Sequence, residues 1–144
     1  FDIIKNYIIC NLLDNYLLLK SHSTICIIGD GYGYLGQLIK FFKSDIKIIY
    51  INIGVNLLID SYFFSLIFKE EKPLLLDKNN TDQISNSSVI FVEAENVHLL
   101  SYIDINIFIS IASMQEMNNS TITDYFNIFR NNEYPVLKSL LSNI

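Results

Sequence analysis

Short apolar runs of strand length alternate along this chain with longer segments in which apolar residues recur at helical spacing. The runs predict four strands, which cover residues 25–28, 46–53, 89–93 and 104–111. The longer segments predict four helices over 3–20, 35–43, 57–68 and 121–130, with a further helical turn around 96–100. Strands that alternate with helices are typical of a parallel sheet with helices on both faces. We therefore expect a three-layer α/β fold.

The same pattern predicts which side chains face the core. In the helix after the first strand, the expected inward residues are Leu35, Leu38, Ile39 and Phe42, and the expected outward residues are Gln37, Lys40 and Lys43. In the last helix the expected inward residues are Ile122, Tyr125, Phe126 and Phe129, with Ser120 or Thr121 as the N-cap.

The polar residues of 3–20 share no single face, which predicts burial on more than one side. Strict alternation in 104–111 predicts one solvent-exposed face, and the polar stretch 77–88 predicts a surface loop.

Composition limits the class of protein. With 144 residues, 51% of them hydrophobic, residues 1–144 have the length of a single domain, with a leading helix over 1–20 and a βα core over 24–130. The net charge is −5 and the ten Lys and Arg residues are scattered, which argues against a nucleic-acid partner. Polar residues interrupt every long apolar stretch and no signal peptide is visible, so we expect no membrane span and a cytoplasmic protein. Cys10 and Cys26 lack metal-ligand spacing and fit a reducing compartment.

The stretch "ICIIGDGYGYLGQLIK", residues 25–40, places four glycines between the end of a predicted strand and the first turn of a predicted helix. Positions 31 to 36 match the dinucleotide pattern G-x-G-x-x-G, and positions 29 to 33 match the G-x-G-x-G turn of class I methyltransferases. In both, glycine lets the backbone approach the ligand in dihedral angles that a β-carbon forbids. Asn52 ends the second strand, where either kind of enzyme usually has an acid for the ribose hydroxyls. An amide loses the charge-assisted part of that hydrogen bond, about 1 kcal/mol, so Asn52 weakens both interpretations without separating them.

Residues 104–117, "DINIFISIASMQEM", and the following "NNSTITDYFNIF" carry a more specific signal. An apolar strand that ends in Ser-Met-Gln-Glu-Met, followed by a polar turn and a helix bearing Tyr and Phe, resembles the sugar O-methyltransferase family of bacterial polysaccharide loci. In that family a similar stretch follows a "GyG" first motif. The segments "IIYIN" and "LLIDSYFFSLIF" look like the family's second strand and following helix, so the resemblance runs from about residue 25 to residue 129.

The resemblance implies a Rossmann-like class I methyltransferase fold, with S-adenosylmethionine as cofactor across the carboxyl ends of the first two strands. The residues that match the cofactor turn are Gly29, Gly31 and Gly33. Asn52 stands where the family has its ribose-binding aspartate, and Ile27 where it has an acid for the methionyl end of the cofactor. Asp30 is the candidate substitute for that second acid. Glu93, which closes the third strand, stands where class I methyltransferases often bind the adenine amino group.

The loop after the fourth strand should lie beside the point of methyl transfer. The resemblance makes site residues of Ser113 and Gln115, toward the substrate, and of Glu116. Methyl transfer to a sugar hydroxyl needs alignment of the reacting atoms and a base for the hydroxyl proton. Glu116 is the first candidate base and His98 the second, whereas Met114 and Met117 fit packing. No His, Cys or carboxylate group has metal-ligand spacing, so we expect no metal.

Two other functions stay open at this point. One is an NAD-dependent oxidoreductase domain, and the other is a non-catalytic Rossmann-like remnant or interaction module. A class I methyltransferase sheet has more strands than the four predicted here, so we expect a truncated sheet, the N-terminal part of such a domain. The fourth strand would then have an unpaired edge, the acceptor side would be open, and the isolated chain would transfer little or no methyl. The closing "PVLKSLLSNI" shows a short helical pattern and adds no βα unit.

Overall fold

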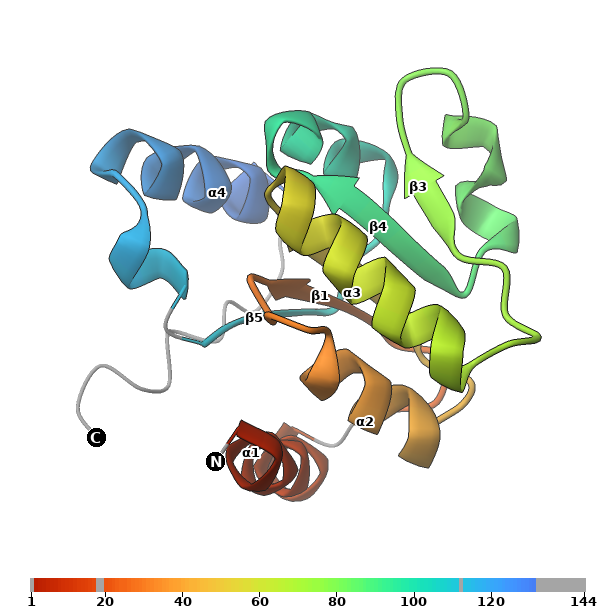
Figure 1. The fold of residues 1–144 in the computed structure, drawn as a ribbon. Helices are drawn as coiled ribbons and strands as arrows, with labels where there is room; N and C mark the ends of the chain where they lie inside the picture. The colour runs from red at the N-terminus through yellow and green to blue at the C-terminus, as the bar shows by residue number, and fades with distance from the viewer. Residues whose placement is uncertain (1, 18–19, 112, 132–144) are drawn as a thin grey trace.

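The structure is a computed structural model that describes residues 2–17, 20–111 and 113–131 (Figure 1). The described residues form a parallel sheet with the strand order β3-β4-β2-β1-β5. The strands are β1 (Thr24–Ile28), β2 (Lys47–Asn52), β3 (Leu74–Leu76), β4 (Val89–Glu93) and β5 (Ile107–Ser110). Helices flank this sheet, so the predicted α/β architecture is confirmed, and it is compatible with the Rossmann-like class.

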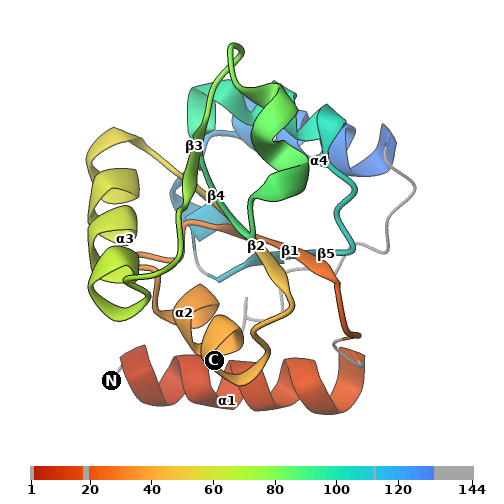
Figure 2. The ribbon, with the colours of Figure 1, turned by 90° about the vertical axis from the view of Figure 1, so that its right-hand side faces the viewer.

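Helices cover both faces of the sheet (Figures 1 and 2). The α-helices are α1 (Asp2–Leu17), α2 (Tyr34–Phe42), α3 (Gly54–Ile67) and α4 (Asn119–Asn131). Three short 3₁₀ helices are η1 (Thr81–Asn86), η2 (Ala94–Tyr102) and η3 (Ser113–Glu116). Side chains of α1, α2 and α3 share one core cluster with the sheet, and side chains of η1, η2 and α4 share the other.

Strand β1 shows why the sequences of the central strands are almost unbroken apolar runs. All five of its residues are buried. Ile25 and Ile27 pack into the cluster under α1, α2 and α3, while Cys26 and Ile28 pack into the opposite cluster. Because both faces are covered, neither set of side chains has to be polar. Each fully buried aliphatic side chain stabilises the fold by roughly 1.5–3 kcal/mol.

Two expectations about the strands are wrong. A fifth strand, β3, follows Pro73 and pairs with β4, and its three residues are too few to show a periodicity. The strand predicted over 104–111 is shorter and has no solvent-exposed face, because α4 and η2 cover the side that was expected to be wet. Its buried residues are Ile107, Phe108 and Ile109. Within the described part of the chain, β5 pairs only with β1 and forms one edge of the sheet.

The last helix differs from the prediction in its cap and in its inner face. Asn118 is the N-cap, since its side-chain Oδ1 accepts a hydrogen bond from the Thr121 N–H at 2.9 Å. Tyr125 is buried as expected, but Phe126 is 42% exposed. The side chain of Phe129 and the whole segment 132–144 lie outside the described residues.

Helix α1 is buried on one side only, contrary to the expectation for 3–20. Its buried side chains are Asn6, Cys10 and Leu13. Its exposed apolar side chains are Ile4, Tyr7, Ile8 and Leu12. The polar Asn6 therefore faces inward while apolar neighbours face outward, which explains why no single polar face is visible in the sequence. In the polar stretch 77–88, predicted as a surface loop, residues 81–86 form the short helix η1.

Helix α2 buries two polar side chains that its periodicity places at the surface. Gln37 is buried, and its Nε2 donates to the Tyr32 carbonyl at 3.1 Å. Lys40 is only 3% exposed. Phe42, expected inside, is exposed instead. The buried face of this helix is thus rotated relative to the face that apolar spacing alone predicts.

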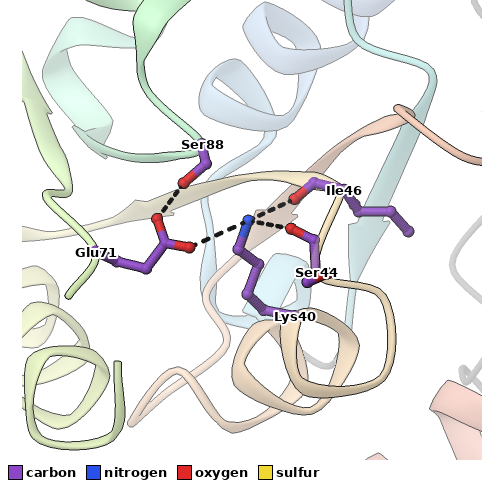
Figure 3. Close-up of polar contacts among 5 residues, drawn as sticks. All are labelled: Lys40, Ser44, Ile46, Glu71 and Ser88. Carbon is purple, nitrogen blue, oxygen red and sulfur yellow. Dashed lines mark hydrogen bonds and ion pairs between the residues drawn. The ribbon is translucent and has the colours of Figure 1, made fainter. Parts of the chain in front are cut away.

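Backbone carbonyls and one carboxylate satisfy the buried Lys40 ammonium (Figure 3). Its Nζ donates to the Ser44 carbonyl at 2.7 Å and to the Ile46 carbonyl at 3.2 Å. It also pairs with Glu71 Oε1 at 3.7 Å, and the other Glu71 oxygen accepts a hydrogen bond from the Ser88 hydroxyl. A buried charge is tolerated only when it is paired and hydrogen-bonded, and these contacts meet that condition. Since Glu71 lies between α3 and β3, the network also joins the end of α2 to that segment.

Replacing Glu71 tests this network. Glu71→Ala should lower the free energy of unfolding by about 1–3 kcal/mol, because it leaves the Lys40 ammonium with carbonyl partners alone. Urea denaturation measures the change. The matched control is Glu70→Ala, an exposed neighbour that should change the free energy of unfolding by less than about 0.5 kcal/mol. Equal effects of the two substitutions would contradict a structural role for the pair.

Candidate functional site

The carboxyl ends of four neighbouring strands bring several predicted site residues to one edge of the sheet. Glu93 ends β4, Asn52 ends β2, Gly29 follows β1, and Ser113 lies just after β5. The chain passes from β1 to β2 on one side, whereas β5 lies on the other side of β1. Open α/β sheets bind ligands at such a switch point, outside the carboxyl ends of the strands. The glycine turn begins at this point.

The turn between β1 and α2 depends on left-handed backbone. The φ angles are +67° at Gly29, +54° at Gly31, +55° at Tyr32 and +67° at Gly33. Glycine adopts these angles without penalty, whereas a residue with a β-carbon loses roughly 1–2 kcal/mol. The Gly29 N–H donates to the Ile51 carbonyl at 2.9 Å, which ties the start of the turn to β2.

Ser113 packs directly against the start of the glycine turn. A β-carbon on Gly29 would lie 2.4 Å from the Ser113 Cβ, so only glycine allows this approach. The Ser113 hydroxyl donates to the Ile28 carbonyl at 2.7 Å and lies 2.8 Å from the Ser110 hydroxyl. The fold therefore brings the glycine turn and the start of the Ser-Met-Gln-Glu-Met stretch into contact, although 85 positions separate Ile28 from Ser113.

Asp30 caps helix α2 from within the turn. Its carboxylate accepts hydrogen bonds from the Leu35 N–H at 3.1 Å and the Gly36 N–H at 3.0 Å. Gly33, the N-cap residue, has no side chain to do so. Burial raises the pKa of the Asp30 carboxyl to about 7, while the two amide hydrogen bonds lower it. The first-turn amides of α2 thus already have an acidic partner.

Asn52 is held by a buried acid that sequence reasoning missed. Its Nδ2 donates to Asp60 Oδ2 at 2.9 Å, and its Oδ1 accepts from the Ile53 N–H at 3.0 Å. Asp60 lies in α3 and is 1% exposed. Burial raises the pKa of Asp60 to about 6, and the hydrogen bond from Asn52 acts in the opposite direction. The available signal was a lone acid within the strongly apolar stretch "LLIDSYFF" that follows β2.

Glu93 lies beside Asn52 at the next strand end. The two residues are partners in the register of β2 and β4. Glu93 is half-buried, and its Oε1 lies 3.8 Å from the point where a β-carbon on Gly54 would stand. Ile27, by contrast, points into the core cluster under α1, α2 and α3 and is 1% exposed. An acid in its place would be buried in apolar surroundings, which explains an aliphatic residue there.

The two candidate bases lie on the 3₁₀ helices η2 and η3. His98 is exposed on η2, and its carbonyl accepts a hydrogen bond from the Ser101 hydroxyl. Gln115 and Glu116 are exposed on η3. Among the hydrogen bonds and ion pairs of the described residues, none joins His98 or Glu116 to residues 29–33. Met114 and Met117 pack against the core, which confirms the packing interpretation of both.

A groove of about 320 Å³ lies away from this edge, between α1 and the end of α2. Its lining residues are Tyr7, Cys10, Asn11, Asp14, Phe42 and Lys43. It sits at the far end of α2 from the glycine turn, roughly 13 Å along the helix. We place the candidate site at the turn rather than in the groove, because the turn has the convergent polar groups and the switch-point position.

The chain matches no protein-family model, and a comparison with curated proteins finds no significant relative. Within the described ranges, none of the helices combines the length and the apolarity that crossing a bilayer requires. The same ranges hold no group of three or more His, Cys, Asp or Glu side chains placed to bind a metal ion. The geometry of the turn and its neighbours is therefore the structural basis for a proposed function.

Substitution at Gly29 tests the contact between the turn and η3. Gly29→Ala should lower the free energy of unfolding by about 2–4 kcal/mol, of which about 1 reflects the left-handed backbone and the rest the overlap with Ser113. Gly31→Ala is the matched control, since a β-carbon there meets no atom within 4 Å and only the backbone cost of about 1 kcal/mol applies.

Adding Ser113→Gly to Gly29→Ala should recover the part that comes from overlap. Urea denaturation of the three variants measures these differences. If Gly29→Ala is no more destabilising than Gly31→Ala, the close contact between the turn and η3 is wrong.

Proposed function

We propose that this chain binds S-adenosylmethionine at the glycine turn and serves methyl transfer to a sugar hydroxyl. The observation that carries the proposal is the Asp30 carboxylate on the first-turn amides of α2. A dinucleotide places its pyrophosphate at such a helix N-terminus, where the N–H groups and the helix dipole attract negative charge. Here the Leu35 and Gly36 amides already donate to the two carboxyl oxygens of Asp30, so they are not free for a phosphate. The resemblance of the Ser-Met-Gln-Glu-Met stretch to the sugar O-methyltransferases supports the same choice.

Above the Asp30 pKa of about 7, where its carboxyl is ionised, charge favours a cationic ligand over a pyrophosphate at this turn. Two unit charges about 4 Å apart interact by roughly 1 kcal/mol in water and roughly 4 kcal/mol at a partly screened protein surface. A pyrophosphate beside Asp30 would meet repulsion of this order, whereas a ligand with a sulfonium and an ammonium group would be attracted. Asp60 lies close enough beneath the turn to raise the pKa of Asp30, so it adds to the negative potential there.

The residues present fit this cofactor. The backbone of residues 29–33 would hold its methionyl part, Asn52 its ribose and Glu93 its adenine amino group. When bound, S-adenosylmethionine supplies an electrophilic methyl group on sulfur. The chain itself would align the acceptor hydroxyl and remove its proton, a task for Glu116 or His98.

The acceptor side involves the loop after β5. The Ser113 hydroxyl is engaged by the Ile28 carbonyl and by Ser110, so its part is to hold this loop against the turn. Gln115 and Glu116 are exposed on η3, where they can reach a sugar hydroxyl. Of the two candidate bases, Glu116 is nearer in sequence to Ser113 and thus to the contact with the turn, which favours it over His98.

Calorimetric titration with S-adenosylmethionine, S-adenosylhomocysteine and NAD⁺ tests the proposal. We expect the first two to bind and NAD⁺ to show no measurable binding. Asp30→Asn should lower the affinity for S-adenosylmethionine about fivefold, the equivalent of about 1 kcal/mol. The loss should be smaller for S-adenosylhomocysteine, because that ligand lacks the sulfonium charge.

The alternatives give different results in the same titrations. Binding of NAD⁺ without S-adenosylmethionine would favour the oxidoreductase domain. Binding of none of the three ligands by a folded chain would favour a non-catalytic module. A uniform effect of Asp30→Asn on both adenosyl ligands would mean that Asp30 acts only as a helix cap.

A further inference from the structure

Helix α3 buries one acid, Asp60, between the end of β2 and the glycine turn. Asp60 is 1% exposed, and acids are rarely buried this completely unless they are paired. Its Oδ2 accepts the hydrogen bond from Asn52, and the Gly33 N–H also faces the carboxylate and lowers its pKa, while its Oδ1 has no hydrogen-bond partner of normal geometry among the described residues. Burying a carboxylate with an unused oxygen is costly, so a structural role alone does not account for an acid at this position.

Asp60 lies between the end of β2 and the glycine turn. A β-carbon on Gly33 would stand 3.6 Å from the Asp60 Cβ and 3.2 Å from Gln37 Nε2. The hydrogen bond to Asn52 reaches from the same carboxylate to the strand end. One side chain of α3 is thus in contact range of both halves of the candidate cofactor site.

The contacts of Asn52 fix the orientation of its amide. Its Nδ2 faces a carboxylate and its Oδ1 faces a backbone N–H, so rotating the amide by half a turn would place donor against donor and acceptor against acceptor. A carbonyl oxygen has two lone pairs, and the Ile53 N–H uses one. The second lone pair of Oδ1 can accept a hydroxyl hydrogen.

We propose that Asp60 is a positioning residue that holds Asn52 as the acceptor for the ribose diol of an adenosyl ligand. In this arrangement the end of β2 has an amide, Asn52, in place of an acid. The negative charge comes instead from Asp60 in α3, which acts on the ligand through Asn52. The inference rests on the proposed cofactor for the identity of the ligand. It goes beyond that proposal because it predicts that an acid at position 52 lowers the affinity for the ligand instead of raising it. The substitution Asn52→Asp would place two carboxylates next to each other, where a 2.9 Å hydrogen bond now joins an amide to a carboxylate.

Exchanging the two residues separates this inference from a purely structural role. The variants are Asn52→Asp, Asp60→Leu and the double exchange Asn52→Asp with Asp60→Asn. Asn56→Asp is the matched control, because it adds the same charge at an exposed position of α3. The probes are S-adenosylhomocysteine and its analogue without the 2′- and 3′-hydroxyls, both titrated by calorimetry at pH 8.

We expect each single substitution to lower the affinity for S-adenosylhomocysteine about tenfold, since the acceptor is repelled or loses its orientation. The affinity for the analogue without hydroxyls should change less than about threefold. The double exchange should return the affinity for S-adenosylhomocysteine to within about threefold of wild type, because an amide at position 60 can donate to a carboxylate at position 52. The control should leave both ligands unaffected.

Urea midpoints of the same variants separate loss of folding from loss of binding. If the wild type binds but the single variants lose affinity equally for both ligands, or if the double exchange recovers only the urea midpoint, Asp60 is structural and the inference is overturned. If the folded wild type binds neither S-adenosylmethionine nor S-adenosylhomocysteine, the proposed function itself fails and the ribose contact fails with it.

Discussion

Both faces of the parallel sheet are covered, and this burial decides where the chain can place polar groups. Strands β1, β2 and β4 have no solvent-exposed face, so their side chains are almost all apolar. Polar groups that could meet a ligand are therefore confined to the strand ends and to the turns that follow them. The switch point between β1 and β5 brings the left-handed glycine turn, Asn52, Glu93 and the loop after β5 to one edge.

The helical layer on one face carries two buried ionic groups, and they differ in how far they are satisfied. Lys40 has two carbonyls and Glu71 as partners, which is consistent with a structural junction. Asp60 accepts a hydrogen bond from Asn52 and faces the Gly33 N–H, but its Oδ1 has no hydrogen-bond partner of normal geometry among the described residues. Incomplete satisfaction of a buried group is typical of functional sites rather than of structural pairs. This contrast is why we assign a ligand-related role to Asp60 and not to Lys40.

Much of the fold could be predicted from the sequence, because the continuous isoleucine-rich runs and the glycine turn reflect local requirements. Strand β3 escaped prediction because three residues after Pro73 carry no period. Lys40 and Asp60 were missed for a different reason. A prediction from periodicity places polar residues on the outer face of a helix. Burial of Lys40 depends on Glu71, 31 positions away along the chain, and burial of Asp60 depends on Asn52, 8 positions away. The positions of Asn52 and Glu93 at neighbouring strand ends were predictable from topology, but the partner of Asn52 was not.

We propose an adenosyl ligand at the glycine turn rather than in the groove between α1 and α2. Backbone amide chemical shifts, followed by NMR while S-adenosylhomocysteine is added to the chain, distinguish the two places. We expect the largest shifts at the turn and the neighbouring strand ends, with Phe42 and Lys43 at the groove unmoved. Largest shifts at Phe42 and Lys43, or no shifts at saturating ligand, would show that the turn is not the site.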